Sequence, residues 1–153
     1  MLTDDVVNIM KKGINLAIRG APLPDSGLQA SKLATLETCL CAAPEHLLQL
    51  GRPKNPADLS SHKWVIYNLT ADLVTLTKGK RSFSITTTGS ISTNNAAART
   101  AFVEAGHGLG RIPTYDAWPK IKAGTLETVL EDYTFSEINV YGTFPQGTAL
   151  SHN

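Results

Sequence analysis

The chain has 153 residues, 42% of them hydrophobic, and a formal net charge of +1 at pH 7, which is typical of one globular domain or two small lobes. The near-neutral charge provides no basic surface for nucleic acid, and no apolar run approaches the length of a membrane span. The first residues are acidic and lack the pattern of a signal peptide. We therefore expect a cytoplasmic protein that neither spans a membrane nor reads nucleic acid through this chain.

The first third of the chain is predicted to contain one helix and two strand regions. Apolar spacing favours a helix over residues 4–12 and a mostly buried strand over residues 14–19. A helix followed after one glycine by a buried strand is typical of α/β units, which favours a parallel sheet covered by helices. Residues 21–30 are predicted to form a loop and residues 32–43 a strand region.

The only two cysteines of the chain, Cys39 and Cys41, lie two residues apart in that strand region. Residues at this spacing share one face of a strand, but their Cα atoms are held too far apart for easy disulfide formation. We expect both to be reduced, which agrees with a cytoplasmic location. A zinc site is not expected, because zinc-binding cysteine pairs usually have two to four intervening residues and a second pair of ligands.

The middle of the chain is predicted to alternate between short helices and strands. A short helix over residues 45–50 is expected to end at Gly51, and a strand is predicted over residues 64–67. Residues 73–76 and 83–86 are predicted to pair as strands, with an exposed turn between them.

Residues 91–113 are predicted to form, in order, a strand, a helix cap, a helix, a glycine turn and a buried strand. Thr93, Asn94 and Asn95 have short polar side chains that favour a helix N-cap. Gly106 is expected to end the helix. The spacing i, i+3, i+4, i+7 predicts that the buried face of the helix is formed by Ala98, Ala101, Phe102 and Ala105.

The start of this helix is the strongest candidate for a binding site in the chain. A helix start presents unpaired amide groups and a partial positive charge, so it suits a small carboxylate or phosphate. The alternative is an ordinary capped helix that packs on a sheet and binds nothing.

The last part of the chain is predicted to contain a helix over residues 115–122 and strands over 125–130 and 138–144. The glycines at 106, 108 and 110 do not form a dinucleotide fingerprint, because they follow a helix and precede a strand. No serine, histidine and aspartate set is recognisable, so no catalytic residue is assigned and no enzyme is expected.

Histidines and tryptophans are interpreted as structural residues. His62 is expected to fix the loop before it, whereas His46 and His107 are expected at the surface or in local hydrogen bonds. Trp64 and Trp118 are expected to pack in the core or at an interface.

Four sequence blocks occur in the order and spacing of a known family. In chain order they are GINLAIRG at residues 13–20; AP at 43–44 with GRP at 51–53, PADL at 56–59 and His62; NN at 94–95 with GHGLGRIP at 106–113; and IKAGTL at 121–126 with VL at 129–130. On these blocks the chain resembles the effector-binding domain of LysR-type transcriptional regulators. Asn15 stands where the family usually has aspartate and Arg111 where an apolar residue is common, which leaves the type of ligand open.

The resemblance implies an α/β fold of two lobes, like type 2 periplasmic binding proteins, with mixed sheets flanked by helices. One lobe, regulatory subdomain I, would comprise residues 1–38 and 133–153 and would be incomplete. The other, regulatory subdomain II, would comprise residues 39–132. The family's N-terminal winged helix-turn-helix is not in this sequence, so the chain is expected to be a truncated fragment.

The resemblance further implies that a small, anionic metabolite binds between the lobes as an effector. The predicted effector-binding residues are Thr93, Asn94, Asn95, Arg19 and Gly20. Arg19 ends a buried strand, where it could either hold a ligand carboxylate with two hydrogen bonds or form an internal salt bridge.

A homodimer or homotetramer is expected, with DNA bound only through the missing domain and with no cofactor or metal. The alternative is a stand-alone solute-binding protein of the same fold, which a signal peptide would indicate.

Overall fold

The computed structural model describes residues 16–19, 28–68 and 72–145. The described residues fall into two compact units: a large unit formed by Glu37–Ser136, and a small unit formed by the described parts of 6–36 and 137–153. The helix predicted over residues 4–12 and the candidate Gly20 lie outside the described residues. The assignment of residues 1–38 with 133–153 and of 39–132 to two regulatory subdomains stays a prediction.

The small unit contains a three-stranded antiparallel sheet in its described part. β11 (Ile138–Pro145) lies in the middle, between β1 (Ala17–Arg19) and β2 (Leu28–Leu36). The parallel pairing expected for the first strand is therefore not found among the described residues, because β1 pairs antiparallel with β11. The start of β2 also corrects the sequence prediction, since residues 28–30 were expected to belong to a loop.

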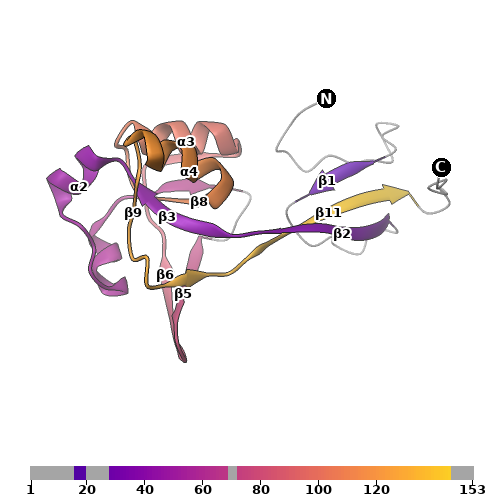
Figure 1. The fold of residues 1–153 in the computed structure, drawn as a ribbon, viewed down its shortest axis with the longest axis horizontal. Helices are drawn as coiled ribbons and strands as arrows, with labels where there is room; N and C mark the ends of the chain where they lie inside the picture. The colour runs from indigo at the N-terminus through magenta and orange to yellow at the C-terminus, as the bar shows by residue number, and fades with distance from the viewer. Residues whose placement is uncertain (1–15, 20–27, 69–71, 146–153) are drawn as a thin grey trace. The chain divides into compact units, whose positions relative to one another are not determined.

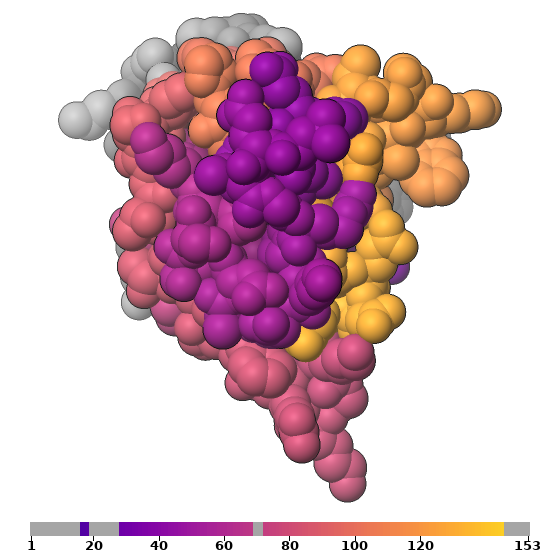
Figure 2. All heavy atoms as spheres, turned by 90° about the vertical axis from the view of Figure 1, so that its left-hand side faces the viewer, coloured from indigo at the N-terminus to yellow at the C-terminus, as the bar shows by residue number. Residues whose placement is uncertain are grey.

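The large unit carries three small sheets in its described part. Two are antiparallel, with the orders β8-β3-β9 and β10-β5-β6, and the third pairs β4 with β7 in parallel. The strands are β3 (Thr38–Ala42), β4 (Val65–Tyr67), β5 (Leu73–Lys78), β6 (Arg81–Thr86), β7 (Ile91–Thr93), β8 (Gly110–Pro113), β9 (Glu127–Thr128) and β10 (Thr134–Phe135). The predicted pairing of residues 73–76 with 83–86 is confirmed, and the hairpin that they form projects from the large unit (Figure 2).

The helices of the large unit begin and end largely where the sequence predicts. α2 (Pro44–Leu50) begins with proline, whose fixed φ suits the first helical position, and ends at Gly51 with φ 84°. α3 (Ala96–Glu104) and α4 (Thr114–Ala123) lie against β3 and β8 (Figure 1), and a 3₁₀ helix, η1 (Pro56–Ser61), precedes β4. In the described part of the chain, no helix is long and apolar enough to cross a membrane.

The core of the large unit lies on both faces of β3. Leu40 and Ala42 belong to one apolar cluster, together with Leu59, Trp64, Leu76 and Leu109. Cys39 and Cys41 point to the other face, where the second cluster contains Val65, Val103, Ile112, Ala117 and Leu126. Alternate residues of a strand face opposite sides, so the predicted common face of the two cysteines is confirmed.

Trp64 is a core residue as predicted, with 3% of its surface exposed, whereas Trp118 is 68% exposed and does not belong to the core. Gly108 allows a close approach of two backbone segments, because a Cβ at this position would lie 2.6 Å from the carbonyl oxygen of Lys63.

The buried face of α3 differs from the predicted one. Arg99, Thr100 and Val103 are buried, whereas Ala101, Phe102 and Ala105 of the predicted face are exposed. The prediction was wrong because alanine residues indicate only weakly which face of a helix is buried. The two polar residues are buried because they have specific partners, which are described below. Val103 is placed by a close fit to Gly110, at which a Cβ would lie 2.5 Å from the valine Cγ2 atom.

Candidate functional site

The start of α3 lies at an edge where two parallel strands end. β7 runs parallel to β4 with Thr93 opposite Tyr67, and the backbone N–H of Asn68 donates to the carbonyl oxygen of Thr93 at 2.9 Å. α3 begins at Ala96, directly after β7. In α/β folds, ligands commonly bind beyond the carboxyl ends of parallel strands, where helix starts point outward.

Thr93 and Asn95 form the cap of α3. The hydroxyl oxygen of Thr93 accepts from the backbone N–H of Asn95 at 3.1 Å, and Oδ1 of Asn95 accepts from the backbone N–H of Ala98 at 2.8 Å. The predicted cap is therefore confirmed. Capping occupies the side-chain oxygen of Asn95 and not its NH₂ group, and the residue is exposed, so capping and ligand binding do not compete.

A buried arginine lies one helical turn after the cap. Arg99 has 5% of its surface exposed, and its guanidinium lies over the ring of Tyr67, 5.0 Å from the ring centroid. Such a cation–π contact partly compensates a guanidinium for the loss of water. Since Tyr67 is the register partner of Thr93, the charge of Arg99 lies close to the start of α3.

A second guanidinium belongs to the same region. Nε of Arg111 on β8 donates to the hydroxyl of Thr38 at 2.8 Å, and another of its nitrogens donates to the carbonyl oxygen of Ser136. Burial lowers the pKa of Arg111, and the nearby positive charge of Arg99 lowers it further. We call Tyr67, Thr93, Asn95, Arg99 and Arg111 the positive corner; it combines two guanidinium groups with the positive end of a helix dipole.

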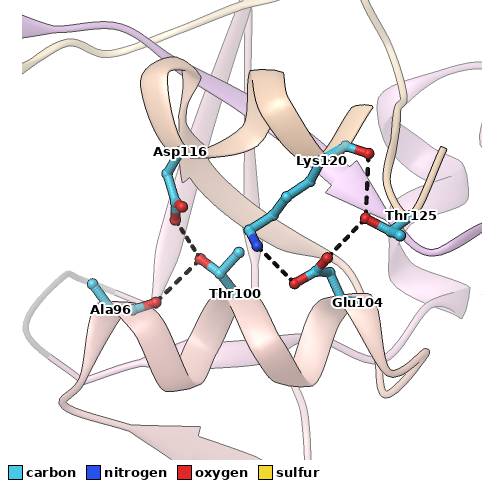
Figure 3. A network of polar contacts seen from close by, with 6 residues as sticks. All are labelled: Ala96, Thr100, Glu104, Asp116, Lys120 and Thr125. Carbon is cyan, nitrogen blue, oxygen red and sulfur yellow. Dashed lines mark hydrogen bonds and ion pairs between the residues drawn. The ribbon is translucent and has the colours of Figure 1, made fainter. Parts of the chain in front are cut away.

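A polar network ties α3 to α4 (Figure 3). The hydroxyl of Thr100 lies 2.7 Å from Oδ2 of Asp116 and 3.1 Å from the carbonyl oxygen of Ala96, so its one proton is shared between two acceptors. Further along the helices, Glu104 accepts from Lys120 at 2.9 Å. These hydrogen bonds lower the pKa of the Glu104 carboxyl and raise that of the Lys120 ammonium. The network explains why α3 packs stably although its buried face is only weakly apolar.

The structure brings together three of the five predicted site residues. Thr93, Asn94 and Asn95 lie side by side at the start of α3. Arg19 belongs to β1 of the small unit, where its backbone is paired with Tyr141, and its side chain is not described. Gly20 lies outside the described residues, so the roles of Arg19 and Gly20 stay predictions.

Sequence reasoning missed Tyr67 and Arg99 as residues of the site. Arg99 follows the cap residue Asn95 by four positions, which places both on one side of the helix, and this spacing could have indicated it. The sequence indicates Arg111 only as a departure from the family pattern. In the structure it places a second positive charge near Arg99. Nothing in the sequence indicates the contact of Tyr67.

The histidines form a separate feature of the large unit. Nε2 of His46 lies 3.0 Å from Nδ1 of His62, and both residues are only 4% exposed. His46 is thus buried and not at the surface, and its partner His62 lies 16 residues further along the chain, so the prediction for His46 was wrong. His107 is exposed, as expected. Within the described ranges no group of three or more histidine, cysteine, aspartate and glutamate residues could hold a metal ion.

A shallow hollow of about 250 Å³ lies elsewhere on the large unit, between residues 52–54, Lys78, Thr128 and residues 130–133. Two of its basic residues form ion pairs, because Arg52 contacts Glu127 and Lys78 contacts Asp132, and Lys54 and Glu131 add one further charge of each sign. None of its lining residues belongs to the positive corner. Because the lining carries both positive and negative charges, it favours no single class of ligand.

Comparisons with known proteins agree with this architecture. A family model described as the LysR substrate binding domain matches residues 1–153. The HTH-type transcriptional activator AaeR of Escherichia coli K12 is 29% identical over 145 residues, which are 94% of this chain and 47% of that protein. The HTH-type transcriptional regulator PtxR of Pseudomonas aeruginosa is 28% identical over 95% of this chain and 47% of its own length. The chain thus spans about half the length of the curated relatives it matches.

Two solved structures show the same fold at low sequence identity. The full-length Vibrio cholerae virulence activator AphB gives a TM-score of 0.78 at 19% identity, over 95% of this chain and 50% of that chain. The regulatory domain of CrgA from Neisseria meningitidis gives 0.76 at 17% identity, over 93% of this chain and 71% of that chain. These likenesses confirm the α/β fold class predicted from the sequence.

Proposed function

Because this chain belongs to the LysR substrate-binding domain family, and is therefore an effector-binding domain and not an enzyme, we propose that its effector is a small anionic metabolite bound at the start of α3. The observation that carries this proposal is the capped helix start beside the buried Arg99. A buried guanidinium and a helix start both favour a negative charge, and they do so from the same corner of the fold.

The chemistry of the positive corner supports an anion with a flat or compact polar group. The guanidinium of Arg99 and the NH₂ group of Asn95 are donors, whereas the backbone N–H of Ala98 and the hydroxyl of Thr93 are already engaged in the cap. Carboxylates accept several hydrogen bonds at once, so a small carboxylate suits a site made chiefly of donors. The ring of Tyr67, over which the Arg99 guanidinium lies, would supply an apolar surface next to these donors.

The whole protein would act as a DNA-binding transcription regulator in the cytoplasm. DNA would be bound by a winged helix-turn-helix outside this sequence, and the chains would pair as a homodimer or homotetramer. The effector would act by binding one arrangement of the protein more tightly than another, since only differential affinity shifts such an equilibrium. The alternative of a stand-alone solute-binding protein receives no support from the matched relatives, which are transcription regulators.

Binding experiments with charged and neutral ligand pairs test the proposal. We would measure urea unfolding of the chain with acetate, succinate and benzoate, each beside its neutral amide. A carboxylate at a hundred times its dissociation constant should add about 2.7 kcal/mol to the free energy of unfolding, and its amide should add far less. Equal stabilisation by the amide, or no stabilisation by any of the carboxylates, would contradict an anionic effector.

A further inference from the structure

Cys39 and Cys41 are placed as an interacting pair of thiols. Their sulfur atoms lie 3.5 Å apart on one face of β3, and they are the only cysteines of the chain. Both thiols are free, and neither side chain belongs to the positive corner. The face that they share packs on Val103 and Ile112, so the pair is held by the core of the large unit.

The two thiols are not equivalent. Cys39 is half-buried, whereas Cys41 is fully buried with 0% exposure. Hydrogen bonding from the thiol of Cys41 lowers the pKa of Cys39, and the same hydrogen bond together with burial raises the pKa of Cys41. Cys39 is therefore the more exposed and the more acidic of the two thiols, and the sulfur of Cys41 lies 3.5 Å behind it.

The geometry points to Cys39 as a modification site for hydroperoxides, with Cys41 as the thiol that resolves the product into a disulfide. The thiolate of Cys39 attacks one peroxide oxygen, a sulfur–oxygen bond forms, and the oxygen–oxygen bond breaks. The departing oxygen takes up a proton and leaves as water or an alcohol. Cys39 is thereby oxidised by two electrons to a sulfenic acid, and the peroxide is reduced.

Resolution needs no second oxidant. The sulfur of Cys41 attacks the sulfur of Cys39, a sulfur–sulfur bond forms, and the sulfur–oxygen bond of the sulfenic acid breaks. The hydroxide released combines with the proton of the Cys41 thiol and leaves as water. The distance of 3.5 Å between the sulfur atoms places the partner within reach of this step without a separate docking event.

The resulting disulfide would be strained, which makes it reversible. Residues i and i+2 of a strand have Cα atoms about 6.6–6.8 Å apart. This spacing is at the upper limit of about 6.8 Å for disulfides, whose usual Cα separation is about 5.5–6 Å, so closing the bond favours a shorter β3. Strained disulfides are easily reduced and are typical of regulatory sites.

Shortening β3 would also reach the positive corner. Thr38 directly precedes Cys39 and accepts a hydrogen bond from Arg111, and Cys41 pairs with Gly110 on β8. Oxidation therefore acts on a strand that helps to position an arginine of the effector site. The modification itself does not depend on the identity of the effector.

Hydrogen peroxide is the probe that tests the pair directly. The reduced chain is treated with peroxide, unfolded, and assayed for free thiols and for intact mass. We expect both thiols to disappear, with a mass loss of two hydrogen atoms and full recovery after dithiothreitol. Retention of both thiols, a persistent gain of oxygen, or a disulfide only between chains would overturn the proposal, and this part needs no variant.

Two substitutions assign the roles of the two thiols. Cys41→Ser should stop at a sulfenic acid on Cys39 that dimedone traps, and Cys41→Ala provides a second version if serine disturbs the buried position. Cys39→Ser should lose its remaining thiol at least about tenfold more slowly than the wild type, because Cys41 is buried and protonated. Equal rates for Cys39→Ser and the wild type would reverse the assignment and refute it.

Discussion

The two roles of Asn95, as helix cap and as ligand contact, can be separated by two substitutions. Asn95→Ala removes the acceptor that holds the backbone N–H of Ala98 at 2.8 Å. Loss of such a cap costs about 1 kcal/mol of folding free energy. Asn95→Asp keeps an equally good cap, and its negative charge at the helix start adds about 0.3–1 kcal/mol of stability at low salt.

The aspartate variant should nevertheless bind an anion more weakly. Two like charges about 4 Å apart in a water-exposed site repel by about 1 kcal/mol. That repulsion corresponds to roughly a fivefold loss of affinity, because 1.4 kcal/mol equals a factor of ten. We therefore predict that Asn95→Asp retains or gains stability while losing affinity for the carboxylate that stabilises the wild type.

Urea unfolding and isothermal titration at low salt measure the two effects separately. Ser82→Asp is a matched control, since it adds the same charge at an exposed position of the β5–β6 hairpin, and it should leave affinity unchanged. Unchanged affinity in Asn95→Asp, with the control behaving the same, would show that Asn95 is only a cap. A loss of stability in Asn95→Asp as large as in Asn95→Ala would refute the capping geometry.

Two further predictions concern the supports of the large unit. Thr100→Val should lower the free energy of unfolding by about 1.5–3 kcal/mol, because it removes a buried hydroxyl 2.7 Å from the carboxylate of Asp116; an unchanged urea midpoint would contradict this. Burial lowers the pKa of both His46 and His62 below 6.5. Their contribution to stability is therefore present above about pH 6.5 and is lost as the pH falls below it. The free energy of unfolding, measured from pH 8 to pH 5, should fall steeply in the wild type and in the exposed control His107→Gln. In His62→Asn it should fall less steeply. Equal slopes in all three proteins would exclude the buried histidine pair as the cause.

Local signals in the sequence predicted most of the large unit. Gly51 and Gly124 end helices with positive φ, and the polar residues before Ala96 cap α3, because each of these features depends only on neighbouring residues. The common face of Cys39 and Cys41 follows from strand alternation alone.

Features that depend on distant partners could not be predicted. The buried face of α3 contains Arg99 and Thr100, and their burial is compensated by Tyr67 on β4 and Asp116 on α4. Periodicity assumes that the buried face is apolar, so it selected the alanines instead. The antiparallel pairing of β1 was missed for a similar reason, since its partner β11 lies more than a hundred residues away in the chain.

Backbone amide chemical shifts during a ligand titration test the location of the effector site most directly. The ¹⁵N-labelled chain would be titrated with the carboxylate that stabilises it most, and in parallel with the neutral amide of that compound. Binding at the positive corner predicts the largest shifts at residues 93–98, none in the β5–β6 hairpin, and little response to the amide. Saturable shifts that leave residues 93–98 unchanged and cluster elsewhere would contradict the assignment of the effector site.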